Sequence, residues 1–194
     1  MAILAPFNAV LSTLDFFTGE TPNYPISFVI SFAINGVMVI VVLLCIAYSE
    51  LGSNKAKINL MFALTAMLLC VLPLIVDKSR IIFGELVCFW LTVVLLVLLG
   101  ILTAVSQSAV LSYMSALQDL KYMAIASFAM GVSALIQNAI RALVLLTFNS
   151  ANLTGILIYY SITSILLLIA SACYYLEKEN SFSIYYGIAS KDKL

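Results

Sequence analysis

Long, continuous apolar runs separated by short polar segments make up almost the whole of this chain. A helix needs about 20 apolar residues to cross a bilayer core of about 30 Å, and five of the runs meet or approach that length, with a shorter run at the front. The regular alternation of polar and apolar residues that is typical of membrane β-strands does not occur in them. The pattern predicts an all-α, polytopic transmembrane helical bundle with six spans, at residues 1–17, 26–48, 58–76, 83–113, 122–148 and 156–176.

Basic residues between these runs predict how the bundle is oriented. Cytoplasmic connections carry an excess of Lys and Arg. With the N-terminus inside, the cytoplasmic side holds six basic residues and the outer side two: Lys55, Lys57, Lys121, Lys178, Lys191 and Lys193 against Lys78 and Arg80. We therefore expect residues 1–176 to form the bundle, residues 177–194 to form a cytoplasmic tail, and both termini to be cytoplasmic. The plasma membrane is the favoured location.

Composition narrows the function classes. Hydrophobic residues are 64% of the 194, charged residues 9%, and the mean hydropathy is +1.16, which excludes an ordinary soluble domain. The net charge is zero, so nothing indicates nucleic-acid binding. Histidine is absent and the four cysteines show no metal-ligand spacing. We expect no metal, no cofactor and no enzymatic activity. The hypothesis of intramembrane catalysis has little support, because no paired acids or Ser/His pattern occurs.

The first run and the span edges contain residues that usually end or distort helices. Residues 1–17 resemble the outer half of a span, and Asp15 and Glu20 are expected to mark its exit from the membrane. Pro73 is expected to kink or end the third helix. Glu85 is expected at the interface, where water can hydrate its carboxylate.

Polar side chains are rare in the spans, and each must find a partner or a watery path. Asn8 and Asn35 could each form a hydrogen bond between helices. In the fourth span, Gly100, Thr103 and Gln107 fall on one helical face. That face is either a close helix packing seam joined by Gln107 or a stripe that faces a substrate.

Arg141 is the most costly residue in the predicted spans. Burying a cation in hydrocarbon costs about 2.5 to 3.5 kcal/mol on insertion scales, and Asn138 lies one turn before it. Arg141 is about 29 Å along a helix that begins at Tyr122. Its side chain could therefore extend to the outer interface, or it could serve a solute pathway with Asn138.

Four short motifs, in order along the chain, resemble the N-terminal half of the equilibrative nucleoside transporters. Residues 4–8 (LAPFN) and 15–17 (DFF) are similar to the family's Leu-Pro-Trp-Asn and Asp-Tyr-Phe. The SQS around Gln107 is similar to its Gln-Gly-Ser. Residues 129–134 (AMGVSA) stand where the family has Gly-Gln-x-x-x-Gly, with Arg141 twelve residues after the first position. Residues 173–176 and 182–186 are similar to its sixth-helix exit.

The resemblance implies a nucleoside or nucleobase carrier that works by facilitated diffusion and alternating access, with a fold like the N-terminal half of a major-facilitator-like transporter. Family members have a further five-helix half, which these 194 residues lack. The implied substrate-binding residues are Phe7, Asn8, Leu11, Gln107 and Arg141, with Asn35, Thr103 and Asn138 as secondary candidates. The alternative is a half-size membrane interaction protein, or a degenerate fragment, that transports nothing.

Overall fold

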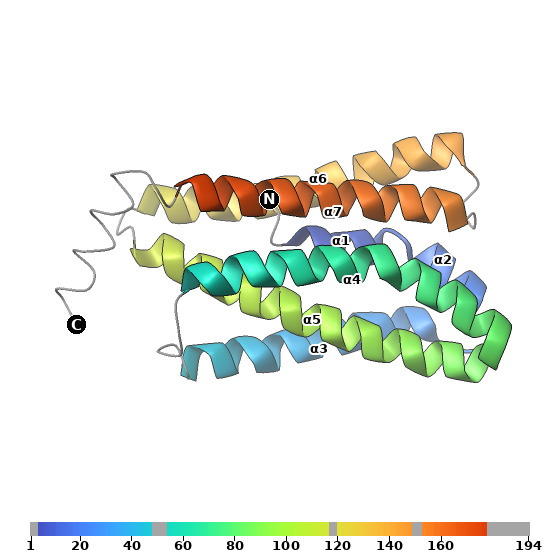
Figure 1. The fold of residues 1–194 in the computed structure, drawn as a ribbon. Coiled ribbons are helices and arrows are strands. Elements are labelled where there is room, and N and C mark those ends of the chain that lie inside the picture. The colour runs from blue at the N-terminus through green and yellow to red at the C-terminus, as the bar shows by residue number, and fades with distance from the viewer. Residues whose placement is uncertain (1–3, 48–53, 117–119, 149–152, 178–194) are drawn as a thin grey trace.

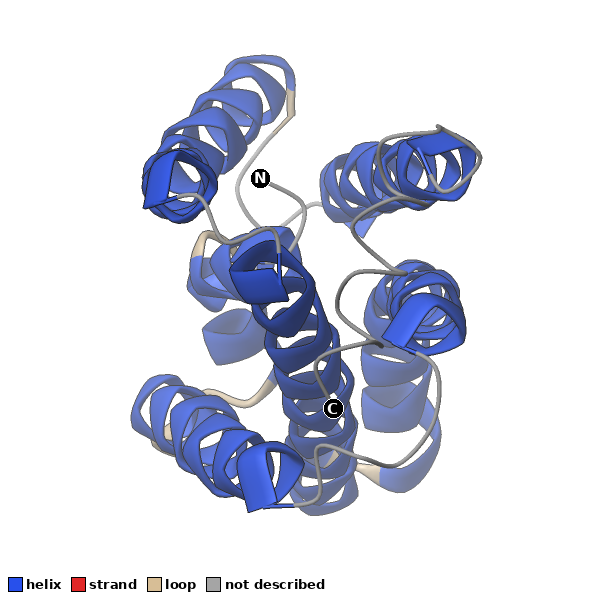
Figure 2. Cartoon of the chain, turned by 90° about the vertical axis from the view of Figure 1, so that its left-hand side faces the viewer, coloured by secondary structure: helices blue, strands red, loops and turns tan. Residues whose placement is uncertain are grey.

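The computed structural model describes residues 4–47, 54–116, 120–148 and 153–177, and all of its regular elements are helices (Figures 1 and 2). In chain order they are α1 (Ala5–Leu11), α2 (Leu14–Glu20), α3 (Ile26–Ala47), α4 (Asn54–Phe83), α5 (Glu85–Ala116), α6 (Leu120–Thr147) and α7 (Leu153–Glu177). The predicted tail, apart from residue 177, lies outside the described residues, as does the motif at 182–186.

Five of these helices, α3 to α7, are long and apolar enough to cross a membrane. The structure is thus that of a polytopic helical membrane protein, and the prediction of an all-α bundle is confirmed at that level. The first predicted span differs from expectation, because residues 5–20 form two helices of seven residues each. Seven residues rise only about 10 Å, so neither helix can span a bilayer alone.

The helix of the third predicted span is longer than the hydrophobic pattern indicated. α4 continues past the predicted end at residue 76 to Phe83, and Pro73 lies buried inside it. Pro73 was expected to kink or end this helix, and it does not end it. A single residue, Gly84, separates α4 from α5, with a φ of 83° that other residues rarely adopt. The chain reverses there without a loop.

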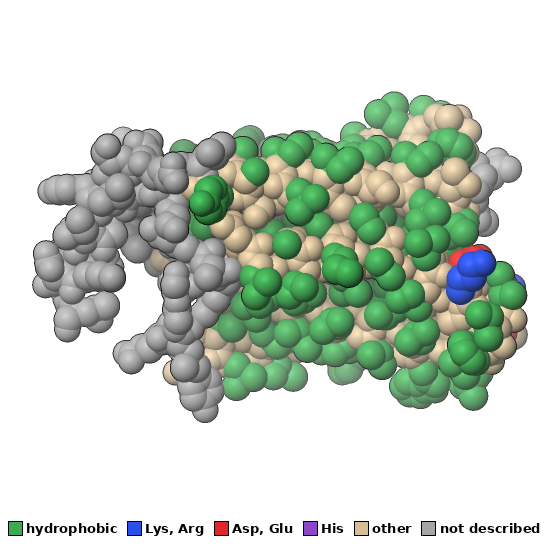
Figure 3. Space-filling view, in the orientation of Figure 1, with side chains coloured by type: hydrophobic (Ala, Val, Ile, Leu, Met, Phe, Trp, Pro, Cys, Tyr) green, Lys and Arg blue, Asp and Glu red, His purple; other side chains and the backbone are tan. Residues whose placement is uncertain are grey.

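The helices run lengthwise beside one another (Figure 1). α4 packs against α5 and α7, and α5 packs against α3. Large buried aliphatic side chains fill the space between them, among them Leu69, Leu72, Leu96 and Leu99. The outer surface is largely hydrophobic, and charged atoms gather at one end in the view of Figure 3. A surface of that kind suits hydrocarbon and not water.

The short helices α1 and α2 pack into this bundle instead of extending from it. α1 contacts α5, α6 and α7, whereas α2 contacts α3 and α4. Phe16 and Phe17 of α2 are almost fully buried. The break between α1 and α2 is therefore held inside the bundle, next to α6 and α7.

Candidate functional site

The break between α1 and α2 falls at Ser12 and Thr13, whose hydroxyl groups compete with the helical hydrogen bonds. Thr13 Oγ1 donates to the carbonyls of Ala9 and Val10, at 3.0 and 3.1 Å, and its amide bonds Val10 in a tighter turn. Ser12 Oγ lies 2.7 Å from the carbonyl of Asn8. Hydroxyl side chains of this kind offer the backbone an alternative to the helix.

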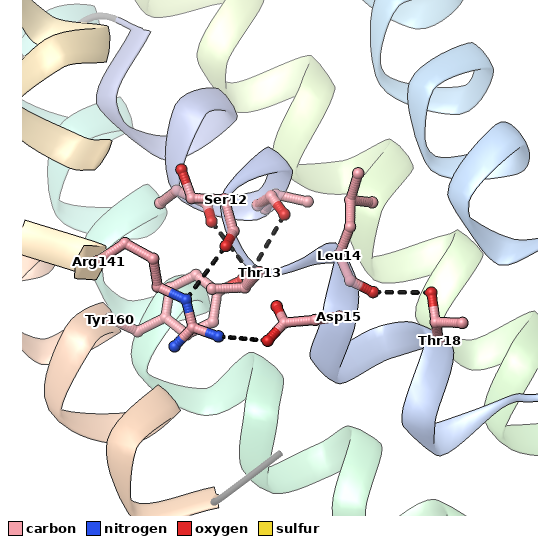
Figure 4. A network of polar contacts seen from close by, with 9 residues as sticks. Ser12, Thr13, Leu14, Asp15, Thr18, Arg141 and Tyr160 are labelled. Atoms are coloured by element: carbon pink, nitrogen blue, oxygen red, sulfur yellow. Dashed lines mark hydrogen bonds and ion pairs between the residues drawn. The ribbon is translucent and has the colours of Figure 1, made fainter. Parts of the chain in front are cut away.

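Arg141 of α6 reaches into this break (Figure 4). Its Nε donates to the Ser12 carbonyl at 3.1 Å, and its Nη2 lies 2.7 Å from Asp15 Oδ2 in the first turn of α2. The guanidinium carbon is 5.9 Å from the centre of the Tyr159 ring. One side chain of α6 thus bonds both sides of the α1–α2 break.

Burial contradicts the interpretation that the Arg141 side chain extends to the outer interface. Its side chain is 5% exposed, whereas that of Asp15 is 40% exposed. A snorkelling arginine would extend its charged end to water, and Arg141 does not. A buried charge is tolerated where an opposite charge and further hydrogen bonds compensate it, and Asp15 and the Ser12 carbonyl provide both.

Helix α7 also contacts the break between α1 and α2. The Tyr160 hydroxyl lies 2.7 Å from Thr13 Oγ1, and both Tyr159 and Tyr160 are fully buried. Tyr159 donates to the Gln137 carbonyl, and Thr163 donates to Gln137 Oε1 at 3.1 Å. These contacts fix α6 and α7 relative to the discontinuous segment.

Three of the predicted polar residues come together around Ser12. Its hydroxyl lies 2.9 Å from Asn138 Oδ1 as well as 2.7 Å from the Asn8 carbonyl, and a hydroxyl has one proton to donate to either. Asn8 Nδ2 is buried and has no hydrogen-bond partner among the described residues. Ser12 therefore joins the backbone carbonyl of Asn8, the side chain of Asn138 and, through its own carbonyl, the side chain of Arg141.

Phe7 and Leu11 lie half-buried on α1, and Phe7 packs against the hydrophobic core. The structure thus places both on the same short helix as Asn8. Their implied role in substrate binding remains a prediction.

Gly100, Thr103 and Gln107, which were predicted to share one face of the fourth span, have different surroundings in the structure. A Cβ on Gly100 would lie 3.4 Å from the Ile34 carbonyl of α3, which makes this end a packing seam. Thr103 is buried, and Gln107 is half-buried with no hydrogen bond recorded in the described part of the chain. No described contact joins Gln107 to Arg141.

Asn35 is separate from the other candidates. It is exposed on α3, and its Nδ2 donates to the Ser31 carbonyl of the same helix at 2.9 Å. The interhelical hydrogen bond expected for it does not occur within the described chain.

Asp15 is the partner that sequence reasoning missed, because its carboxylate was interpreted as the end of a span. Glu20 and Glu85 do lie at a helix end. Glu20 pairs with Arg80 at 3.1 Å, and Glu85 accepts from the amide and side chain of Asn23. An acid and a base within apolar runs of one chain usually pair, and that signal could have joined Asp15 to Arg141.

Side chains that could ligate a metal ion are scattered through the described part of the chain. Within the described ranges, no group of three or more His, Cys, Asp or Glu side chains comes together. What the arrangement provides is a compensated buried charge, a set of hydroxyl and amide groups, and a break in a helix at the depth of the apolar bundle.

Comparison with known proteins provides no relative of this chain. No family model, no curated protein and no solved structure matches the chain.

Proposed function

We propose that this chain is one helical bundle of a membrane carrier for nucleosides or nucleobases, working by facilitated diffusion and alternating access. The observation that carries the proposal is the discontinuous α1–α2 segment, whose break Arg141 and Asp15 connect inside the bundle. Carriers commonly use discontinuous helices to place polar backbone groups near the membrane midplane. Non-helical backbone at such depth is tolerated where protein buries it or where it lines a watery cavity.

The polar groups at the break suit a solute that is flat, apolar on its faces and polar at its edges. Phe7 and Leu11 offer apolar contact from α1, and Asn8 offers an amide beside them. The Asn8 amide has a buried donor to spare. Gln107, on α5, can supply both a donor and an acceptor to the edge of a base.

Arg141 has a different role in this proposal from that of a direct ligand. Two of its donors are used by Asp15 and Ser12. Its charge therefore fixes the angle between α1 and α2, and a change in that pairing alters the shape of the pathway. Arg141 acts as a gating or positioning residue.

Alternating access needs a second bundle that rocks against the first. The resemblance implies a further five-helix half that would supply it. The proposal includes the plasma membrane as the location and cytoplasmic termini.

Uptake of radiolabelled adenosine into vesicles that contain the chain together with the second bundle that alternating access requires tests the proposal. We expect saturable uptake that unlabelled uridine or adenine competes away and that Gln107→Ala lowers about tenfold, since one lost hydrogen bond to a polar edge is worth about 1.4 kcal/mol. Ser161→Ala, an exposed residue on α7, is the matched control. The proposal would be contradicted if these vesicles showed neither adenosine uptake nor adenosine binding above the level of protein-free vesicles.

A second candidate function is a membrane interaction protein that transports nothing. The observation that favours it is the largely uncovered surface of α3, of whose span only 11% is buried. Saturable adenosine uptake would exclude this alternative.

A further inference from the structure

The outward face of α3 is unusual for a helix in a folded bundle. Its buried residues, Ile26, Ile30 and Ile34, lie on one side. On the opposite side, Phe28 is 75% exposed, Phe32 is 73% exposed and Val39 is 62% exposed, with the exposed Asn35 between them. At 100° per residue the centres of the two faces are about 170° apart. Asn35 itself lies about 140° from the centre of the buried face.

The four outward residues lie along one face of α3. Phe28, Phe32, Asn35 and Val39 are separated by four, three and four residues. These steps average about 3.7 residues, close to the 3.6-residue period of a helix, so the apolar side chains flank Asn35 on the same side.

Asn35 is also at the costliest depth for an amide. It lies midway along the span Ile26–Cys45, about 14 Å from either end. One of its N–H groups bonds the Ser31 carbonyl, and no described residue bonds its Oδ1. A side-chain amide has two N–H donors and an oxygen acceptor, so one donor and the acceptor face hydrocarbon unless a partner covers them.

The chain's own polar groups near this face do not reach Asn35. Thr18 Oγ1 lies 3.2 Å from Ser27 Oγ, and Ser31 donates to the Ser27 carbonyl. Among the described helices, α5 and α2 pack most closely against α3. The Gly100 contact with Ile34 places α5 on the buried side. What satisfies Asn35 therefore comes from outside the described bundle.

We propose that α3 is the interface through which two copies of this chain form a dimer in the membrane. A two-fold axis along the membrane normal sets each Asn35 opposite the other copy's Asn35 at the same depth. The unused donor of each amide then bonds the unused oxygen of the other, so the residue is its own complement. Phe28, Phe32 and Val39 pack above and below this pair.

This dimer does not depend on the proposed transport function, because none of its contacts involves the α1–α2 break. Its experiment measures association, and the uptake experiment measures transport. Either proposal can therefore fail alone.

Energy transfer between donor-labelled and acceptor-labelled copies of the full chain, in vesicles at a series of protein-to-lipid ratios, tests the dimer. We expect Asn35→Leu to raise the dimer dissociation constant about 3- to 30-fold, the range for an interhelical hydrogen bond in lipid. Asn35→Gln, which keeps the amide, retains most of the affinity. Ser161→Leu, an exposed polar residue on α7, is the matched control and changes nothing.

Cysteine crosslinking locates the interface independently of any amide substitution. In a chain whose four native cysteines are replaced by alanine, Phe28→Cys and Phe32→Cys are expected to crosslink between copies on mild oxidation. Leu146→Cys on α6, where the native residue is 85% exposed, is expected not to do so. A monomer at every lipid ratio, crosslinking through α6 alone, or equal affinity for Asn35→Leu and the unchanged chain would each overturn the proposal.

Discussion

Two ion pairs connect the N-terminal segment to distant helices, and they differ in almost every physical respect. Arg141 and Asp15 join α6 to α2 at 2.7 Å, and the arginine side chain is 5% exposed. Arg80 and Glu20 join α4 to the end of the same α2 at 3.1 Å, and that arginine side chain is 46% exposed. An arginine and a carboxylate thus form an internal connection at one end of α2 and a surface contact at the other.

The difference shows that burial, more than the presence of a pair, sets what an ion pair contributes. Breaking a buried pair costs about 3 to 5 kcal/mol, because an uncompensated charge stays behind. An exposed pair contributes about 0 to 1 kcal/mol. The Arg141 pair therefore fixes the arrangement of α1, α2 and α6, whereas the Arg80 pair only adds to the packing of α2 on α4.

The largest expected effect comes from removing the partner of the buried charge. Asp15→Leu should lower the free energy of unfolding by about 3 kcal/mol, because the buried Arg141 then lacks its carboxylate partner. Arg141→Leu should cost less, since the Asp15 side chain that it leaves behind is 40% exposed. Unfolding in mixed micelles followed by circular dichroism measures both. Equal losses would show that the different burial of the Arg141 and Asp15 side chains does not affect the free energy of unfolding.

The double variant Asp15→Leu with Arg141→Leu should recover most of the stability that Asp15→Leu alone loses. No charge is then buried, and apolar residues of similar volume often replace a buried pair at little cost. The double-mutant cycle in the same unfolding assay gives the coupling energy, which we expect to exceed about 1 kcal/mol for groups in direct contact. Additive losses would contradict a direct interaction.

A smaller effect is expected from Tyr160→Phe, which removes a neutral hydrogen bond from the same region. The hydroxyl lies 2.7 Å from Thr13 Oγ1 in a fully buried position. Losing it should cost about 1 kcal/mol, less than Asp15→Leu and more than any change at Arg80. A loss as large as that of Asp15→Leu would mean that the contact with α7 stabilises the α1–α2 break as much as the ion pair does.

The smallest effect is expected at the exposed pair. Glu20→Gln should change the free energy of unfolding by less than about 1 kcal/mol, and raising the salt concentration to 1 M should remove the difference from the unchanged chain. Unfolding at two salt concentrations measures this. A salt-independent loss of several kcal/mol would mean that the end of α2 is as firmly fixed as its beginning.

Much of the fold could be predicted from the sequence because hydrocarbon imposes a simple rule. A continuous apolar segment must satisfy its backbone internally, and a helix does so at any position in the bundle. The existence of α3, α5, α6 and α7 followed from their length and apolarity. Helix ends were less predictable, as α4 shows, because helical hydrogen bonding continues past Val76 into polar residues.

The candidate site was predicted in part. Arg141, Asn138 and Asn8 were selected by their polarity, and the structure brings them together around Ser12. Asp15 was assigned to a membrane exit, since its charge lay close to Glu20 in the sequence. The break at Ser12 and Thr13 was not foreseen, because hydroxyl residues are also common inside intact membrane helices.

By itself, the sequence determined that this is a helical membrane protein with one costly cation in its spans, since length and polarity are local properties. The tertiary structure decided which acid compensates that cation, which helix is broken, and which face of α3 is left uncovered. Those outcomes depend on side chains 126 residues apart coming within 2.7 Å. Only the packing of the helices brings such residues together.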